Sequence, residues 1–221
     1  MEIIAQIVDI FLHIDEYLNT IIESFGIWSY LLLFAVIFME TGVVVTPFLP
    51  GDSLLFAVGT FAASGAFNIV VIFLVLFIAA VLGDTLNYWI GNKIGPRAFE
   101  KDMRFMKREY LERTEAFYEK HGGKTIFLAR FIPIVRTFAP FVAGVGTMPY
   151  NKFLGYNLLG AFVWVGLFLF AGYFFGAIPF IQENFPLVII VIVAISVLPM
   201  AYEFLSARLR QNRREAQESE S

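Results

Sequence analysis

The chain has 221 residues, of which 58% are hydrophobic and 16% carry a charge, with a formal net charge of −3. Because a soluble domain has about 25% charged residues, this composition excludes an ordinary water-soluble protein and predicts a polytopic membrane protein. Cysteine is absent and histidine occurs only twice, which excludes disulfide and thiolate chemistry and a histidine-based metal site, and we expect no cofactor.

Residues 1–24 are predicted to form an amphipathic helix, since their isoleucine and leucine residues recur every three or four positions between acidic ones. This segment contains no lysine or arginine, so we expect it to pack on the protein; a place at the membrane interface is the alternative. It lacks the basic start and the small-residue cleavage site of a signal peptide, and we expect no cleavage. Residues 25–41 are predicted as the first membrane span.

A first re-entrant hairpin is predicted over residues 43–67. Pro50 and Gly51 break the helix there, and Asp52 can cap a new one. The apolar run that follows is too short to cross the hydrocarbon core, which needs about 20 residues. The hairpin therefore carries an acidic residue at its tip.

Residues 69–91 are predicted to span the membrane completely. Asp84 and Asn87 lie one turn apart near the end of this span, where we expect them to support contacts between helices. Residues 92–123 follow as a mixed-charge segment. No lysine or arginine precedes Lys93, so the positive-inside rule places this basic segment in the cytoplasm.

The stretch 124–148 is apolar, yet it carries Arg130 and Arg136 and is interrupted by Pro133 and Pro140. A charge at the bilayer centre costs about 2.5–3.5 kcal/mol on insertion scales, so two arginines there need a function or a partner. Backbone broken by proline is tolerated at membrane depth only inside protein or beside water. We predict a second re-entrant hairpin with a basic tip.

Residues 152–181 and 186–205 are predicted as the last two spans, and residues 206–221 as a second basic segment, the cytoplasmic tail. The chain between the two basic segments must then cross the membrane an even number of times, which two spans and one re-entrant hairpin satisfy. The predicted fold is all-α, with one transmembrane domain over residues 25–205.

A weak internal repeat at an offset of 83 residues aligns Pro50 with Pro133. Each half of the repeat is a hairpin followed by a span, and the two halves run in opposite directions. Inverted repeats whose broken helices face each other near the midplane are a transporter design. Both prolines are therefore predicted to support a site between the hairpins.

The charged residues of the two hairpins are the candidate site. Glu40 and Asp52 belong to the first hairpin region, and Arg130 and Arg136 to the second, so facing hairpins would bring all four together. Guanidinium groups offer planar, bidentate donors to phosphate, and the helix that starts near Pro133 adds backbone N–H donors. We predict that the two arginines bind an anionic group. The two acids are predicted to carry protons, because burial favours the protonated form of a carboxylate.

Each assignment has a structural alternative. Asp52 could serve only as a helix cap, Arg130 could extend to the interface, and Glu40 could be interfacial. The four side chains could also form ion pairs that stabilise the bundle without any ligand. The three tryptophans, Trp164 among them, are assigned to interface belts or to the core.

The chain resembles the DedA family of bacterial inner-membrane proteins, which share a domain with eukaryotic endoplasmic-reticulum lipid scramblases. The resemblance covers roughly residues 25–180 and rests on five motifs: E-T-G at 40–42, P-F-L-P-G-D at 47–52, G-D at 83–84, H-G at 121–122 and R-F-I-P-I-V-R-T-F-A-P-F-V-A-G at 130–144. It implies two facing re-entrant hairpins, essential acids at Glu40 and Asp52, and essential arginines at Arg130 and Arg136.

The resemblance also implies a function. The family is linked to recycling of undecaprenyl phosphate across the inner membrane, to the proton motive force and to envelope integrity. The leading hypothesis is a proton-linked flippase for an anionic lipid, either a polyprenyl phosphate or a phospholipid, with no nucleic-acid partner. The sequence does not determine the oligomeric state, and a homo-oligomer is compatible with it.

Three other functions remain open. The first is a proton-coupled antiporter of a small cation or drug, in which Glu40 and Asp52 exchange protons and the arginines are structural. The second is a lipid phosphatase, which is disfavoured because the membrane-buried stretches hold no histidine and no obvious nucleophile beside the arginines. The third is a structural membrane organiser.

Overall fold

A computed structural model gives the fold of the chain. It describes residues 25–42, 51–100, 122–146, 148–176, 178–185, 187–192 and 194. Within these ranges every regular element is a helix. The predicted amphipathic helix 1–24, the tail 206–221 and most of the segment 92–123 lie outside the described residues, as does Pro50.

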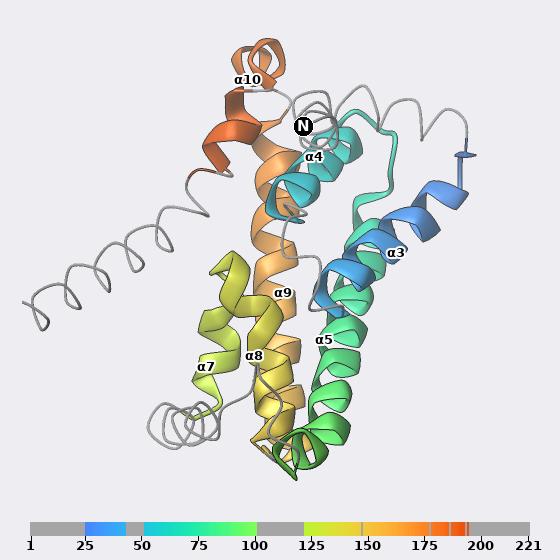
Figure 1. The fold of residues 1–221 in the computed structure, drawn as a ribbon. Coiled ribbons are helices and arrows are strands. Elements are labelled where there is room, and N and C mark those ends of the chain that lie inside the picture. Colours follow the sequence, from blue (N-terminus) through green and yellow to red (C-terminus); the bar gives the residue numbers. More distant parts are fainter. Residues whose placement is uncertain are drawn as a thin grey trace, which may run out of the picture.

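The first three described helices are α3 (Trp28–Gly42), α4 (Gly51–Ala63) and α5 (Ile69–Glu100). Four more follow: α7 (Lys124–Ala129), α8 (Pro133–Val145), α9 (Tyr150–Phe175) and α10 (Pro179–Glu183). Figure 1 shows two long helices, α5 and α9, at the centre of the arrangement, with the shorter helices packed against them.

Helices α3 and α4 form an antiparallel hairpin. At its open end the backbone N–H of Asn68 donates to the Tyr30 hydroxyl at 2.9 Å, which ties the start of α3 to the start of α5. At its tip the N–H of Gly51 donates to Glu40 at 3.0 Å. Helix α3 lies within the predicted span 25–41 and one residue beyond it, and α4 lies within the predicted hairpin 43–67.

Helix α3 has 15 residues and rises roughly 22 Å. After α4 the chain turns through Gly65, whose φ of 90° favours glycine. The side chain of Asn68 then caps α5, accepting the N–H groups of Val70 at 3.0 Å and Val71 at 3.2 Å.

Helices α7 and α8 form a second, shorter hairpin. The helix breaks before Pro133, because Ile132 is extended and proline occupies the first turn of α8, where it removes no helical hydrogen bond. Pro140, in contrast, lies inside α8, so only one of the two prolines breaks the helix.

The long helices differ slightly from the predicted spans. The apolar part of α5 runs from Ile69 to Ile94, and α5 itself continues to Glu100, past the predicted end at residue 91. Helix α9 ends at Phe175, before the predicted end at residue 181, and α10 follows. Residues 187–192 are helical within the predicted span 186–205, whose remainder lies almost entirely outside the described residues.

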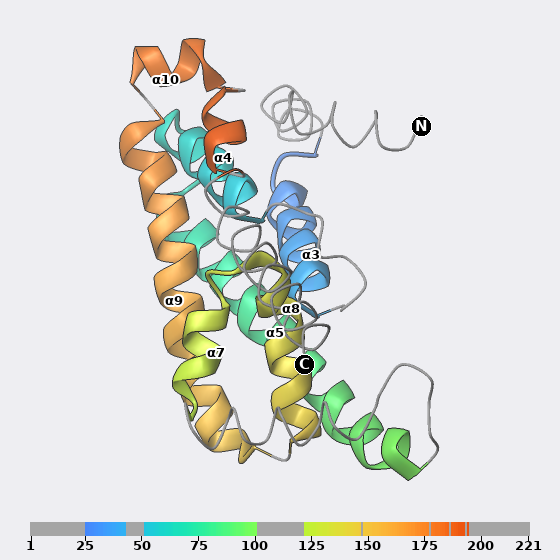
Figure 2. The same cartoon turned by 60° about the vertical axis from the view of Figure 1, so that its left-hand side comes forward.

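The two long helices are antiparallel neighbours. Tyr88, late in α5, stacks on Phe153, early in α9, with ring centroids 4.5 Å apart. Phe73, early in α5, lies 5.8 Å from Phe170, late in α9. Each hairpin packs its second helix on the long helix of the other half: α4 lies on α9, and α8 lies on α5 (Figures 1 and 2).

Glycine residues allow the backbones of these two helix pairs to approach each other closely. On α4 and α9, Gly59 faces the carbonyl oxygen of Leu169, and Gly172 faces that of Phe56. The contact between α8 and α5 repeats the pattern with Gly144 and Gly91 against Tyr88 and Phe141. Small residues let backbones approach closely, which is how helices pack in lipid.

We expect Gly172→Val to destabilise the protein, because any Cβ at this position would overlap the carbonyl oxygen of Phe56. Overpacking of this kind costs about 1–3 kcal/mol or more. The measurement is the thermal unfolding midpoint of the purified protein in detergent. The matched control is Gly155→Ala on the same helix, where an added Cβ meets nothing within 4 Å. Equal midpoints for the two variants would contradict the close crossing.

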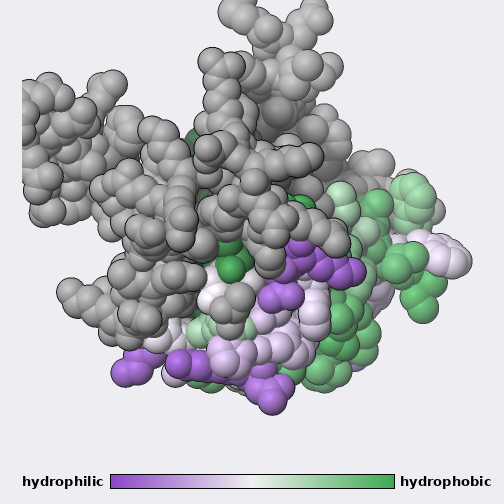
Figure 3. Space-filling model, turned by 60° about the horizontal axis from the view of Figure 1, so that its bottom comes forward, coloured by the Kyte–Doolittle hydropathy of each residue, from purple (hydrophilic) through white to green (hydrophobic). Residues whose placement is uncertain are grey.

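The described surface separates apolar sides from a polar end. Figure 3 brings the lower end of Figure 1 forward and shows hydrophilic surface on that end and hydrophobic surface along one flank. Exposed lysines come from the elements that start or finish there, namely Lys93, Lys124 and Lys152. The flanks of α5 and α9 expose large apolar side chains such as Leu74 and Phe162. Both helices are long and apolar enough to cross a membrane.

Candidate functional site

Arg136 lies between the tips of the two hairpins. It stands in the first turns of α8, and its side chain is 7% exposed. Its Nη1 donates to Asp52 Oδ1 at 2.9 Å, and its Nη2 forms an ion pair with Glu40 Oε1. Glu40 comes from the end of α3 and Asp52 from the start of α4, so one guanidinium holds both arms of the first hairpin.

The backbone of Gly51 completes this cluster. Its N–H donates to the same oxygen of Glu40 that Arg136 contacts, at 3.0 Å. The start of a helix offers unpaired N–H groups, and an anionic side chain is favoured there. The Glu40 carboxylate is therefore held by a helix N-terminus and a guanidinium, with only 1% of its surface exposed.

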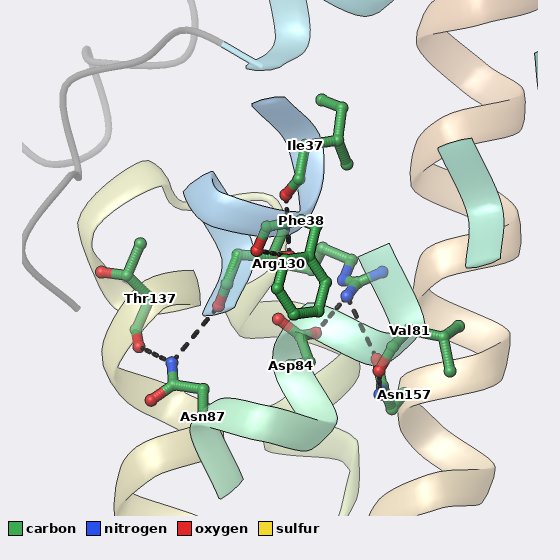
Figure 4. A network of polar contacts seen from close by, with 9 residues as sticks. Ile37, Phe38, Val81, Asp84, Asn87, Arg130, Thr137 and Asn157 are labelled. Carbon is green, nitrogen blue, oxygen red and sulfur yellow. Dashed lines mark hydrogen bonds and ion pairs between the residues drawn. The ribbon is translucent and has the colours of Figure 1, made fainter. Parts of the chain in front are cut away.

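Arg130 forms a second cluster with a different acid. It ends α7, and its Nη2 forms an ion pair with Asp84 of α5 and donates to Asn157 Oδ1 of α9 at 3.1 Å (Figure 4). The amide of Asn157 in turn donates to the carbonyl of Val81 at 3.1 Å. The tip of the second hairpin is thus joined to both long helices.

Trp164 of α9 lies between the two clusters. Its indole Nε1–H donates to Asp52 Oδ1 at 2.8 Å. The Cζ of Arg136 lies 4.9 Å from the centroid of its ring, and the Cζ of Arg130 lies 5.7 Å from it. Both distances fall within the range of cation–π attraction. The side chain is 1% exposed, so it belongs to the core as expected, but it also faces both arginines.

The four predicted site residues are buried near one another, although the arginines divide between two sets of partners. Arg136 forms ion pairs with both predicted acids, whereas Arg130 forms an ion pair with Asp84, which the sequence suggested only as a supporting residue. Asn87 donates to the carbonyl of Thr137 at 2.6 Å and so joins α5 to α8, in line with its expected supporting contact (Figure 4).

Two partners of the arginines, Asn157 and Trp164, were not predicted. Both occur in an apolar helix, and no other polar residue on their face indicates that this face points toward the arginines. A buried asparagine in an apolar span was the one available signal, since polar groups in such helices usually have a partner.

The buried charges do not balance. Among the described residues, three acids and two arginines are buried, which gives a net charge of −1 if all five are ionised. Two arginine donors, Nη1 of Arg130 and Nε of Arg136, have no hydrogen-bond partner in the described part of the chain. The described site therefore holds one more acid than arginine, together with two arginine N–H donors that no protein group accepts.

We expect Gly51→Ala to disrupt the Arg136 cluster without changing its charge. The new Cβ would lie 2.7 Å from Glu40 Oε1, so the carboxylate would have to move away from the backbone N–H and from Arg136. Loss of one hydrogen bond to a charged group costs about 1.5–3 kcal/mol of stability. Gly160→Ala is the matched control, because its Cβ would make an ordinary 3.5 Å contact with Arg130.

The thermal unfolding midpoint of each purified variant in detergent is the readout for both glycine variants. A wild-type midpoint for Gly51→Ala would show that the position of the Glu40 carboxylate does not matter for the fold.

Comparison with known proteins identifies the family. The VTT domain model matches residues 49–174. Protein DedA of Escherichia coli is 50% identical over 208 residues, which cover 93% of this chain and 95% of that protein. The chain belongs to the DedA family. This confirms the resemblance that the motifs carry.

Two further DedA-family comparisons extend this finding. An uncharacterised membrane protein of Mycobacterium tuberculosis is 45% identical over 84% of this chain and 82% of its own length. The inner membrane protein YqjA of E. coli is 34% identical over 68% of this chain and 69% of its own length. No solved structure matches the chain. Together with the two long apolar helices, these relatives show a membrane protein of the DedA family.

Proposed function

We propose that the chain is a transporter that moves an anionic lipid carrier, undecaprenyl phosphate or a phospholipid, between membrane leaflets, linked to the proton motive force. The observation that carries this proposal is the burial of Arg136 between Glu40 and Asp52, at the point where the tips of two hairpins meet. A buried guanidinium between two acids can exchange its carboxylate partners for a phosphate, because both anions fit the same planar set of donors.

Competition between carboxylate and phosphate for Arg136 would couple headgroup movement to proton movement. Arg136 is occupied by two acids, so a phosphate headgroup can bind it only when at least one acid leaves. Protonation of Glu40 or Asp52 removes the charge that holds the acid to Arg136. The headgroup and a proton are therefore expected to bind together and to cross together. Two buried donors without a partner in the described part of the chain, Nη1 of Arg130 and Nε of Arg136, would then donate to the phosphate.

The arrangement of the hairpins supports access from both leaflets. The hairpin of α3 and α4 opens toward one end of the two long helices, and that of α7 and α8 opens toward the other (Figure 1). We propose that both are re-entrant in the membrane, as in inverted-repeat transporters, with Arg130 and Arg136 near the midplane. The exposed lysines at the lower end support a cytoplasmic location for that end under the positive-inside rule, and we propose the same side for the basic segment and the tail. The protein would then serve envelope integrity from the bacterial inner membrane.

A transport assay tests the proposal. Purified protein is reconstituted into liposomes that carry a fluorescent analogue of a polyprenyl phosphate in one leaflet, and a pH gradient is imposed. We expect headgroup movement that accelerates when the leaflet holding the lipid faces the acidic side, and that vanishes with an uncoupler. Movement that is absent, or that ignores the gradient, would contradict the proposal.

A proton-coupled antiporter of a small cation or drug is the second candidate. It is favoured by the surplus of one buried acid over the buried arginines in the described part of the chain, because a net negative site attracts cations. In that case the acids release a proton when a cation binds, and no lipid is required. Cation-induced proton release in lipid-free detergent would support this candidate over the first.

We further propose that the protein is not an enzyme. In the described residues, the hydrogen-bond, ion-pair and ring contacts of both arginines are carboxylates, an asparagine and an indole, with no hydroxyl, thiol or imidazole nucleophile among them. Release of inorganic phosphate from a prenyl phosphate would revive the phosphatase alternative.

A further inference from the structure

Trp164 is the side chain that touches both arginine clusters. Its N–H donates to Asp52, its ring lies 4.9 Å from the Arg136 guanidinium carbon, and the same ring lies 5.7 Å from that of Arg130. No charged side chain of α9 takes part in either cluster, so this helix contributes through Trp164 and Asn157.

The two contacts of the indole have opposite electrical preferences. The N–H group is the positive edge of the ring system and donates to the Asp52 carboxylate. The ring face is negative and attracts guanidinium groups. A single rigid side chain can therefore hold an acid and two cations at fixed separation, which a leucine of the same core could not do.

We propose that Trp164 is a positioning residue shared by the two arginine sites, in which the ring forms a common wall for Arg130 and Arg136 and the N–H holds Asp52 in place for Arg136. This inference rests on the proposed function, because it assigns Trp164 a part in headgroup binding and proton exchange. When Asp52 takes up a proton, the contacts of Trp164 with Asp52 and with Arg136 change together, and the ring carries that change to Arg130.

The charged side chains of the two clusters come from helices other than α9. Arg136 of α8 pairs with Asp52 of α4 and Glu40 of α3, and Arg130, at the end of α7, pairs with Asp84 of α5. Helix α9 contributes the neutral Trp164. The test therefore changes Trp164 alone and leaves these charges in place.

The first variant is Trp164→Phe, which keeps a ring for the guanidinium groups but removes the N–H. Without that donor Asp52 keeps its ion pair with Arg136 but loses its contact with α9, so its position beside Arg136 is less fixed. We expect transport to fall severalfold, up to about tenfold, which corresponds to one hydrogen bond to a charged group. Undiminished transport by the folded variant would overturn the role of the N–H.

The second variant is Trp164→Leu, which removes the donor and the ring face. We expect transport to fall at least tenfold at every pH, while the exposed Trp89→Phe at the end of α5 behaves as the wild type. Thermal unfolding of each purified variant shows whether it is folded. A folded Trp164→Leu protein with wild-type transport would contradict the proposal that the Trp164 ring is a wall shared by Arg130 and Arg136.

A fluorescence measurement decides the question without any lipid. The chain has three tryptophans, so the double variant Trp28→Phe with Trp89→Phe leaves Trp164 as the single emitter. In this background we expect Asp52→Asn to shift the emission maximum, because it replaces the carboxylate that accepts the indole N–H. We also expect Arg130→Gln to shift the emission maximum, whereas Lys152→Gln on the exposed start of α9 does not.

Each outcome separates the two proposals. If the wild type moves no lipid but Trp164 responds to both Asp52→Asn and Arg130→Gln, the proposed function fails and the shared position of Trp164 stands. If the emission ignores either substitution, Trp164 is not shared between the sites, whatever the transport assay shows.

Discussion

Replacing Arg136 by glutamine abolishes lipid transport, with an expected loss of about 100-fold or more. The substitution keeps a polar side chain of similar length but removes the charge that two buried acids share. The phosphate headgroup loses its central cation, and the two acids are left without their partner. Transport of a fluorescent polyprenyl phosphate in proteoliposomes, normalised to folded protein, is the measurement.

Two further variants sharpen this result. Lys152→Gln removes an exposed cation from α9 and serves as the control for general loss of positive charge. Arg136→Lys keeps the charge but presents a point charge in place of a planar fork, so we expect at most partial activity. Undiminished transport by Arg136→Gln would mean that the phosphate is bound elsewhere.

Arg130 and Asp84 permit a test that separates a structural ion pair from a functional one. We expect the single variant Arg130→Met to lose about 3–5 kcal/mol of stability, because it leaves the buried Asp84 unpaired. Adding Asp84→Leu replaces the pair by two apolar side chains, which is often neutral or stabilising. We expect the double variant to recover the folded yield and thermal midpoint of the wild type, yet to transport no lipid.

The recovery of folding without transport is the informative outcome. If the double variant regains both folding and transport, the pair at Arg130 only holds the bundle together, as in a structural membrane organiser. If it regains neither folding nor transport, Arg130 stabilises the fold through Asn157 or Trp164, which also contact it. The single variant Asp84→Leu then shows whether Arg130 without its acid still binds an anion.

The sequence was most informative where a charge sits among apolar residues. Arg130 and Arg136 occur in a stretch that is otherwise suited to lipid. The free-energy cost of placing a charge in lipid is enough to predict that both arginines have buried partners. Their burial at 4% and 7% exposure agrees with that prediction. The break at Pro133 was also predictable, because proline fits the first turn of a helix and disrupts its middle.

The pairing of the charges could not be predicted. Which acid faces which arginine depends on how α5 and α9 are rotated about their axes, and close glycine contacts such as Gly59 on Leu169 and Gly144 on Tyr88 set that rotation. These contacts join segments far apart in the chain. Asp84 was therefore assigned to a supporting contact, and Trp164 to an interface belt or the core, although both contact the arginine sites.

The contacts at the end of α3 could not be predicted either. Glu40 contacts Gly51 at the start of α4 and Arg136 of α8. Arg136 lies 96 positions later in the chain, so no local sequence pattern indicates that contact.

The central claim is that a phosphate headgroup and a proton occupy this site together. Proton uptake during binding measures it most directly: a short-chain polyprenyl phosphate is added to purified protein in weakly buffered detergent, with a pH indicator as the readout. The account predicts uptake of about one proton for each headgroup bound, because the phosphate displaces a carboxylate that must then be neutralised, and it predicts no uptake by Arg136→Gln. Binding without any change in protonation, or with release of a proton, would contradict the account.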